Sequence, residues 1–536
     1  MKLSKRVFLI IFFIIFILGS FLRFYQLGAT PNSLNWDEVS WGYSAYSVLQ
    51  TGKDEYGEAF PLSFRAFGDY KQPFYVYATI LPVALFDLNA FSTRFPSAFF
   101  GSLSILFVFF LTFEIFRKEK YAKTVALLSM FFFAVSPWSI QFSRVAFEAN
   151  VGLFFILLGS WFFIRGLHQK KYWYFFVSAV ALSVSAYTYH SDKLFAPLLF
   201  VVLIIYGWKY FINKRVLTII LLIVFAFCNL FWLIDSRTTA RGQGVLFTAN
   251  KAQLNEIPIA QMQYDNEHGD PLGTLVHNRR VVIAQQYVTN YLDHFNPNWL
   301  FIKGDNPRHH APSMGILYFA NIAFILLGIF YLLKNKPYVS SILFAWLLLA
   351  PVASSLAVEA PNASRSLIFL PTWHIFEAFG WWYAYTSLKN TKLKIMLLIP
   401  LLFLFLNIIY FFHQYFVHTN TNFQRDWQFG YKEAVAYPKE NTDKRTIFSK
   451  NLEQPYIFYL FYTKYSPEKY LKTGGSSRLN EKCYAIDNAY FGDCLDTIKS
   501  GNRYVSSGSE VLKKGKEIKR FNYQNGKPAT TIYINE

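Results

Sequence analysis

Charged side chains are scarce in this sequence. Only 16% of its 536 residues are charged, whereas 53% are hydrophobic and 20% are aromatic. That balance is too apolar for a water-soluble protein of this length, because soluble chains carry about a quarter of their residues as Asp, Glu, Lys and Arg. We therefore expect the lipid bilayer to be the main solvent of the chain.

Cysteine is scarce too. Three cysteines exclude a dense disulfide framework and a Cys-rich metal site. Cys228 lies in an apolar run, whereas Cys483 and Cys494 lie in the polar C-terminal part. If that part is outside the cytoplasm, a Cys483–Cys494 disulfide is one expectation, and two unpaired thiols are the other.

Acidic residues are outnumbered by basic ones. The chain has 52 Lys and Arg against 33 Asp and Glu, a net charge of +19. In a soluble protein such an excess suggests nucleic acid as a partner. Here the basic residues gather in short connections between apolar runs, where they report membrane topology. No nucleic-acid partner is expected.

Eleven apolar runs each come near the roughly 20 residues that a helix needs to cross the hydrocarbon. They cover residues 7–24, 95–116, 121–138, 149–166, 172–190, 193–211, 216–235, 312–333, 338–357, 365–386 and 393–413. Five basic connections between them fall inside the cell if the N-terminus is cytoplasmic. The sequence therefore predicts an α-helical polytopic protein of the cell membrane, with about 11–13 transmembrane helices and an extracytoplasmic C-terminus.

Two segments need separate treatment. Lys2, Lys5 and Arg6 precede the first run without a clear small-x-small cleavage site after it, so we expect an uncleaved first span. Pro73–Leu88 cannot cross without reversing the side of every later basic connection. We expect it to be interfacial or re-entrant, unless a further pair of crossings restores the parity.

The predicted organisation is a transmembrane domain at 1–413, with large outer loops at 25–72 and 236–311, and a C-terminal domain at 414–536. The tail contains a helix-like segment, Leu452–Tyr465, and a hairpin of Glu517–Tyr523 with Thr530–Asn535 around the turn signal Asn525-Gly526. We expect a small extracytoplasmic α/β domain. It is either an architectural cap or a substrate-binding part.

The first outer loop begins with a predicted helix. Asn35 is a favoured N-cap residue, Asp37 and Glu38 fall in the first turn, and Gly52 marks the end. The two acids either complement the helix dipole or carry chemistry. An apolar face, which we expect to lie on the membrane surface, is formed by Val39, Tyr43, Tyr46 and Leu49.

A lysine follows in the same loop. Lys71 brings a cation to the start of the partly inserted segment, where an anionic headgroup would lie, although such a lysine is often only an interfacial snorkel. Three motifs together resemble the GT-C membrane glycosyltransferases: Trp36-Asp37-Glu38, Tyr70-Lys71-Gln72-Pro73 and Arg94-Phe95-Pro96-Ser97-Ala98. The dolichyl-phosphate-mannose protein mannosyltransferases and the bacterial lipid A aminoarabinose transferases are most alike. The resemblance covers about residues 1–430 in architecture and is specific mainly in 30–150.

The resemblance implies roles for the polar residues of the first two outer loops. Asp37 is the expected base or acceptor-orienting group, with Glu38 beside it, and Lys71 contacts the donor phosphate. The usual Lys-Pro-Pro of the family is Lys-Gln-Pro here, which departs from the pattern. In the second outer loop Glu148 stands where the family often has Asp. Arg144 is a candidate phosphate ligand, or pairs with Glu148 four residues away.

Other polar groups lie at the outer ends of predicted spans. Arg365 is a further candidate for the donor phosphate, and Tyr189, His190 and His310 are expected to line the site. The histidines lack nearby acids at metal-ligand spacing, so no metal-binding residue is predicted. No cofactor is expected, and dependence on a divalent metal stays open.

The hypothesis is an inverting glycosyltransferase that moves a hexose or pentose from a polyprenyl-phosphate donor to a hydroxyl of a protein, lipid or glycan acceptor, among membrane lipids. No nucleotide-sugar motif or Gly-rich phosphate loop is visible, in agreement with a lipid-linked donor. The alternatives are a lipid or glycan transporter, an O-antigen-type polymerase or ligase, and a scaffold. The transporter hypothesis rests on His374 and Glu377, which lie deep in a predicted span. The alternative interpretation of these two residues is an interhelical hydrogen bond.

Overall fold

The computed structural model describes residues 4–235, 237, 246–249, 251–440, 444–508, 510–512 and 515–536. Lys2 and parts of the predicted loop 236–311 and domain 414–536 therefore lie outside the described residues. The chain forms two compact units, one of Met1–Gly19, Gly101–Ile140 and Ala149–Ile408, the other of Ser20–Phe100, Gln141–Glu148 and Ile409–Glu536. The predicted boundary at 413 stays a prediction.

Helices occupy all eleven predicted spans. They are α1 (Lys5–Phe24), α4 (Ala90–Ile115), the bent pair α5 (Ala122–Val135) and α6 (Pro137–Ser143), α7 (Glu148–Gln169), α8 (Tyr172–Ala186), α9 (Asp192–Tyr206), α11 (Arg215–Ile234), α16 (Ile322–Asn335), α17 (Pro337–Ser354), α18 (Leu370–Ser387) and α20 (Leu398–His413). In the described part of the chain, six helical segments are long and apolar enough to span a bilayer, or seven with the bent pair. The predicted helical membrane fold is confirmed.

The first unit packs its helices through glycine. At Gly328 of α16 a Cβ atom would lie 1.8 Å from the Phe376 carbonyl oxygen, and at Gly380 of α18 it would lie 1.8 Å from that of Phe324. Only glycine permits this approach, which is how helices associate in lipid. His374 Nδ1 and Glu377 Oε2, 2.9 Å apart, both lie in α18, so the predicted interhelical bond instead joins neighbouring turns of one helix.

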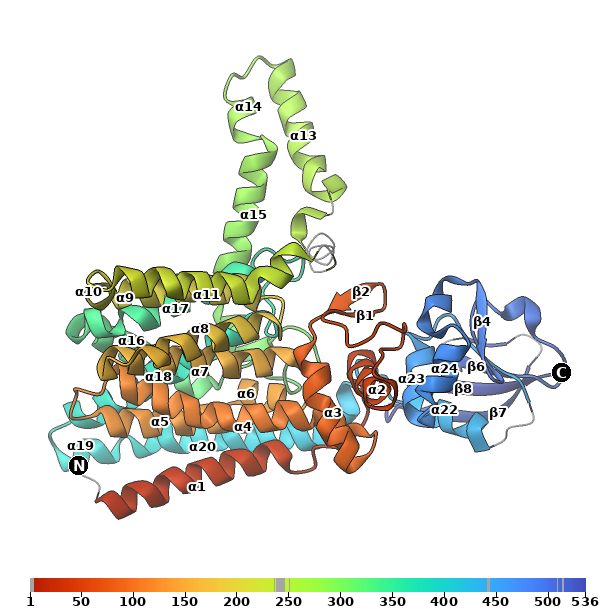
Figure 1. Cartoon of the computed structure of the whole chain (residues 1–536), viewed down its shortest axis with the longest axis horizontal. Helices are drawn as coiled ribbons and strands as arrows, with labels where there is room; N and C mark the ends of the chain where they lie inside the picture. Colours follow the sequence, from red (N-terminus) through yellow and green to blue (C-terminus); the bar gives the residue numbers. More distant parts are fainter. Residues whose placement is uncertain are drawn as a thin grey trace. The chain divides into compact units, whose positions relative to one another are not determined.

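The described part of the predicted loop 236–311 is mostly helical. The short helix α14 (Gly273–Val276) joins the longer α13 (Lys251–Glu267) and α15 (Arg279–Asp293), which run side by side (Figure 1). The short helix α10 (Trp208–Phe211) lies earlier in the chain, between α9 and α11. Asn290 donates to the Ser355 carbonyl oxygen at 3.0 Å, and the Tyr291 hydroxyl donates to that of Leu348 at 2.8 Å. These bonds hold the C-terminal end of α15 against α17 and the residue that follows it.

The second unit contains the first outer loop. Its elements are α2 (Trp36–Thr51), the antiparallel strands β1 (Phe64–Ala66) and β2 (Asp69–Lys71), and α3 (Phe74–Phe86). With 13 residues α3 is shorter than the roughly 20 that cross a bilayer. A helix of this length can enter a bilayer only in part, and the partial insertion of Pro73–Leu88 stays a prediction.

A mixed six-stranded sheet follows in the C-terminal part. Its order is β4-β5-β3-β6-β8-β7, and β3 is parallel to both neighbours. The strands are β3 (Thr446–Phe448), β4 (Cys483–Ile486), β5 (Ala489–Gly492), β6 (Arg503–Ser507), β7 (Gly515–Asn522) and β8 (Pro528–Asn535), and the helices are α21 (Thr419–Asn422), α22 (Tyr431–Glu440), α23 (Pro455–Thr463) and α24 (Pro467–Lys472). The predicted α/β character and the closing hairpin, now β7 and β8, are confirmed.

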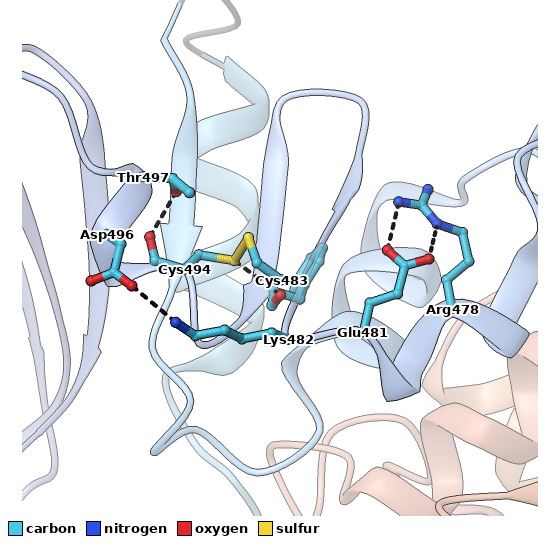
Figure 2. The surroundings of a disulfide bond; sticks show 8 residues. Arg478, Glu481, Lys482, Cys483, Cys494, Asp496 and Thr497 are labelled. Atoms are coloured by element: carbon cyan, nitrogen blue, oxygen red, sulfur yellow. Dashed lines mark hydrogen bonds and ion pairs between the residues drawn. A yellow bond between two sulfur atoms is a disulfide. The ribbon is translucent and has the colours of Figure 1, made fainter.

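Cys483 and Cys494 form a disulfide (Figure 2). It joins β4 to the turn after β5, and the ion pair of Lys482 with Asp496 lies beside it. The bond resolves the two expectations for these cysteines. Cys494 belongs to the buried cluster of the sheet, with Ile447, Tyr504 and Tyr533.

The apolar face of α2 packs on protein. Val39 and Tyr43 are fully buried, and the Tyr43 hydroxyl donates to the Tyr465 carbonyl oxygen at 3.1 Å. The Tyr43 ring also contacts that of Tyr470 in α24. The prediction that this face lies on the membrane surface is wrong for these residues, because its partner is supplied by a segment more than 400 positions later.

Candidate active site

The first turn of α2 is fixed by a capping box. The Asn35 side chain accepts hydrogen bonds from the Asp37 and Glu38 N–H groups at 2.8 and 3.1 Å, and Glu38 Oε2 accepts one from the Asn35 N–H at 3.2 Å. Both acids are thereby held at the helix N-terminus, as the sequence predicts. They point in different directions and have different surroundings.

Asp37 forms an ion pair with Lys71. The distance from Lys71 Nζ to Asp37 Oδ1 is 2.6 Å, and the Asp37 side chain is 41% exposed whereas that of Lys71 is 7% exposed. The structure therefore brings together the two residues that the resemblance singled out. It leaves the carboxylate accessible and covers the ammonium group.

Lys71 lies at the end of β2, the second strand of a tight hairpin. Phe67 and Gly68, which join β1 to β2, both have positive φ, +55° and +78°, as a two-residue type I′ turn requires. Positive φ is unusual for a bulky residue such as Phe67. Its ring centroid lies 5.0 Å from Lys71 Nζ, and that of Trp41 lies 4.4 Å from it. Two aromatic faces thus stabilise the cation while limiting its hydration.

Glu38 turns inward to a buried arginine. Arg94 of α4 contacts its carboxylate with two nitrogens, Nε at 2.7 Å and Nη2 at 3.1 Å, and both side chains are almost fully buried. The Ala146 N–H donates a further bond to Glu38 Oε1 at 3.1 Å. Glu38 therefore ties α2 to α4 and to the second outer loop, and its geometry is that of a supporting residue.

Arg144 is also buried, among carbonyl oxygens. Its guanidinium donates to Leu22 at 2.9 Å, and to the carbonyl oxygens of Arg23, Tyr25, Gln26 and Thr30, while Nε donates to the Tyr415 hydroxyl. The predicted alternative of an Arg144–Glu148 pair is replaced by these contacts. A phosphate would reach Arg144 only by displacing some of them.

Glu148 begins α7 and is half-buried. Burial first, and then the carboxylates of Glu38 and Glu148, raise the pKa of the Tyr75 phenol well above its usual value. The Tyr75 ring lies 5.7 Å from that of Trp41, which covers Lys71. Glu148 thus acts electrostatically on Tyr75, whose ring contacts the Trp41 ring that covers Lys71.

The remaining predicted residues belong to the first unit. The Tyr189 hydroxyl lies 3.2 Å from Ser364 Oγ, and Arg365 donates to the Glu359 carbonyl oxygen at 3.1 Å. His310 is buried, with Nδ1 2.8 Å from the Ala311 carbonyl oxygen, and His190 is half-buried. Tyr189 therefore contacts the turn 361–365, to which Arg365 belongs.

An aspartate missed by the sequence analysis connects His309, the neighbour of His310 in the chain, to that turn. Asp305 Oδ2 accepts from the Ala363 N–H at 2.6 Å and lies 3.2 Å from His309 Nδ1. Burial alone would raise the pKa of Asp305, but His309 and the Ala363 N–H lower it below its usual value. The 305–310 segment and the turn before α18 thus form one polar cluster. Across the described ranges, no group of three His, Cys, Asp or Glu side chains is arranged to hold a metal ion.

Sequence reasoning also missed three residues that act on Lys71. Trp41 and Phe67 carry no recognisable motif, although the pair Phe67-Gly68 between two short strands was a usable turn signal. Glu55 lies in the loop between α2 and β1, is fully buried, and acts electrostatically on Lys71. Nothing in the sequence separates it from the neighbouring acids Asp54 and Glu58.

Comparison with known proteins supports the resemblance. The sequence model of the dolichyl-phosphate-mannose-protein mannosyltransferase family matches residues 71–232. The structure resembles ArnT from Cupriavidus metallidurans bound to undecaprenyl phosphate, with a TM-score of 0.56, 10% identity and 98% of both chains covered. No curated protein matches the chain in sequence.

It also resembles the apo oligosaccharyltransferase of Archaeoglobus fulgidus, with a TM-score of 0.53, 14% identity, and coverage of 86% of this chain and 64% of that one. For the same archaeal protein in complex with Zn and sulfate, the TM-score is 0.51 and the identity 15%, and the match covers 84% of this chain and 61% of that one. The chain spans about three fifths of the length of these archaeal chains. At such identities the likeness shows a shared fold, and the predicted GT-C-like fold is confirmed.

Proposed function

We propose that this chain is an inverting glycosyltransferase that moves a sugar from a polyprenyl-phosphate donor to an acceptor hydroxyl at the outer face of the membrane. The observation that carries the proposal is the pair of Asp37 and Lys71, 2.6 Å apart. A buried cation and an accessible carboxylate are the two groups that such a transfer needs. ArnT, of the same fold, binds undecaprenyl phosphate, which makes a lipid phosphate the natural ligand to test.

Lys71 is the proposed phosphate ligand. When the bond between the anomeric carbon and the phosphate oxygen breaks, its electron pair stays on that oxygen, and the leaving phosphate gains negative charge. A fixed ammonium group stabilises this charge best where water is excluded, as it is between Trp41 and Phe67. Lys71 therefore lowers the barrier without acting as a proton donor.

Asp37 is the proposed base. The acceptor hydroxyl forms the new bond to the anomeric carbon and gives up its proton, and an accessible carboxylate can take it. In the described structure Asp37 is held by Lys71, so a bound donor phosphate would compete for the same cation and free the carboxylate for the acceptor. Attack on the face opposite the leaving phosphate inverts the anomeric configuration.

The buried ion pair of Glu38 and Arg94 supports the pair of Asp37 and Lys71. This buried contact fixes the first turn of α2, and so the direction of Asp37, without reaching the reacting atoms themselves. We retain Glu148 as a group near the acceptor and Arg365 as a further phosphate ligand, and Tyr189, His190 and His310 as lining residues, all to be tested by substitution. For Arg144 we favour the structural role that its carbonyl contacts describe.

The proposed reaction requires no cofactor, and transfer measured with and without a chelator shows whether a divalent metal takes part. The proposed location is the cell membrane, with the N-terminus in the cytoplasm and the C-terminal domain outside. The Cys483–Cys494 disulfide supports that side, because disulfides persist mainly in oxidising compartments.

A panel of polyprenyl-phosphate sugars offered to the purified protein, with mass spectrometry of the products, tests the proposal. Sugar transfer to a hydroxyl with an inverted anomeric centre is expected for at least one donor. Lys71→Met should abolish most transfer, whereas Lys469→Met, which removes an exposed lysine paired with Asp487, should leave it intact. Movement of the intact lipid across a vesicle membrane without sugar transfer would identify a transporter. Full activity of Lys71→Met would refute the phosphate site.

A further inference from the structure

Glu55 is a carboxyl in a place where a charge is costly. It lies between α2 and β1 and has no exposed surface. Its Oε2 accepts a hydrogen bond from the Ser476 hydroxyl at 2.8 Å, whereas its Oε1 has no hydrogen-bond partner among the described residues. Nothing in the proposed reaction uses this group, so its burial requires another explanation.

The contact with Ser476 links two distant parts of the chain. Ser476 lies in the 3₁₀ turn η6 (Gly475–Asn480) of the C-terminal part, and its N–H donates to the Glu55 carbonyl oxygen at 2.9 Å. A Cβ atom at Gly475 would lie 2.6 Å from that carbonyl oxygen, so the approach depends on glycine. The Tyr470 hydroxyl lies 3.0 Å from Ser476 Oγ and extends the hydrogen-bonded chain. Glu55 is therefore the docking point of η6 on the first outer loop.

A shell of phenols and a few charges surrounds the carboxyl. The titratable and charged groups that face Glu55 or this shell are Tyr43, Tyr46, Asp54, Tyr56, Arg65, Lys71, Tyr456, Tyr465, Tyr470, Arg478 and Tyr484. Burial is the largest effect and raises the pKa of Glu55 to about 8, Ser476 and Lys71 oppose it, and Asp54 adds to it. Near neutral pH the carboxyl is thus mainly uncharged.

The charge of Glu55 matters because Lys71 is its electrostatic neighbour. Lys71 already has one carboxylate partner, Asp37. If Glu55 ionises, Lys71 faces two negative groups, and its attraction for an anionic ligand weakens. If Glu55 is neutral, the carboxylate paired with the positive charge is that of Asp37, which is exposed enough for a ligand to compete with it.

We propose that Glu55 is a positioning residue for the donor-phosphate site: its neutral carboxyl docks η6 on the first outer loop and leaves the Lys71 cation available, and its ionisation weakens phosphate binding. This inference rests on the proposed function, since it takes Lys71 as the phosphate ligand. It assigns to the C-terminal part a role in setting the pH range of the site.

The test is the affinity of the purified full chain for undecaprenyl phosphate between pH 6.5 and 9.5. Wild-type affinity should fall about tenfold as Glu55 ionises, the size of effect that about 1.4 kcal/mol produces. Glu55→Gln keeps the neutral shape and should bind as wild type does at pH 6.5, but without this fall. Because both proteins meet the same ligand, titration of the lipid phosphate cancels from the comparison.

Two further variants make the result specific. Ser476→Ala removes a hydrogen bond that lowers the pKa of Glu55, so the fall in affinity should move to higher pH. Glu468→Gln removes an exposed carboxylate paired with Lys472 in the same part of the chain and should keep the wild-type curve.

Parallel curves for wild type and Glu55→Gln, with binding lost in Lys71→Met, would overturn the role of Glu55 and leave the proposed function standing. Unchanged binding by Lys71→Met at pH 6.5 would overturn both.

Discussion

The buried pair of Glu38 and Arg94 gives the sharpest stability prediction. Arg94→Met removes a guanidinium that contacts Glu38 twice and also donates to the Leu27, Pro31 and Ser33 carbonyl oxygens. Breaking one partner of a buried ion pair typically costs about 3–5 kcal/mol, because the other charge stays buried. Two backbone N–H groups still reach Glu38, so we expect about 3 kcal/mol from the charge, with a further loss from the carbonyl groups.

The assay is unfolding of the purified protein in detergent, compared among Arg94→Met, Glu38→Gln and the double variant. Glu38→Gln in the Arg94→Met background removes the uncompensated charge and should recover a large part of the lost stability. Lys464→Met, which breaks an exposed pair with Asp87, is the control and should change stability by less than about 1 kcal/mol. A double variant no more stable than Arg94→Met, or an Arg94→Met variant as stable as the control, would refute this reasoning.

Two other predictions concern the C-terminal sheet and the end of α15. Replacing Cys483 and Cys494 by Ser opens a loop with a sequence separation of 11 residues and should lower the free energy of unfolding by about 3 kcal/mol. The sheet should then unfold at a lower denaturant concentration, and an unchanged unfolding curve would contradict this prediction. Burial lowers the pKa of His294 to about 4, so His294 is neutral in the folded chain; its stabilising effect is full above the ordinary value near 6.5 and is lost as the pH falls toward 4. His294→Gln should therefore flatten the loss of stability over that range, and an identical acid profile would count against the burial of a neutral imidazole.

Local signals in the sequence were sufficient for the first turn of α2. Asn35 was predicted as the N-cap residue, with Asp37 and Glu38 in the first turn, and the structure confirms both and adds a capping box. The pattern could not tell which acid faces outward, because Asp37 and Glu38 are adjacent and a helix turns about 100° per residue. The distinction depends on Arg94, 56 positions after Glu38.

Contacts between distant segments could not be predicted in this way. The apolar stripe with Val39 and Tyr43 is the same whether it meets lipid or protein, so it was assigned to the membrane surface, whereas residues of the C-terminal part cover it. For the same reason the sequence left two roles open for Arg144, a phosphate ligand or a partner of Glu148, and did not indicate its backbone carbonyl contacts. Both a phosphate and a ring of carbonyl oxygens satisfy a buried guanidinium, and only the fold decides between them.

The pairing of Asp37 with Lys71 shows what a resemblance adds. Between them lie 33 residues, and neither periodicity nor composition places them side by side. The motifs predicted that both serve one site, and their side chains are 2.6 Å apart. Phe67 and Trp41, which enclose the cation, were outside the motif and therefore outside the prediction.

The rate of sugar transfer by Asp37→Asn tests the central claim most directly. The amide keeps the shape of the side chain and cannot take a proton, and general-base catalysis typically contributes about 10²–10⁴ in rate. We predict a loss of at least about 100-fold in a variant that still folds and still binds undecaprenyl phosphate. Asp87→Asn, an exposed aspartate at the end of α3, should transfer at the wild-type rate. Near-normal transfer by Asp37→Asn would contradict the assignment of Asp37 as the base.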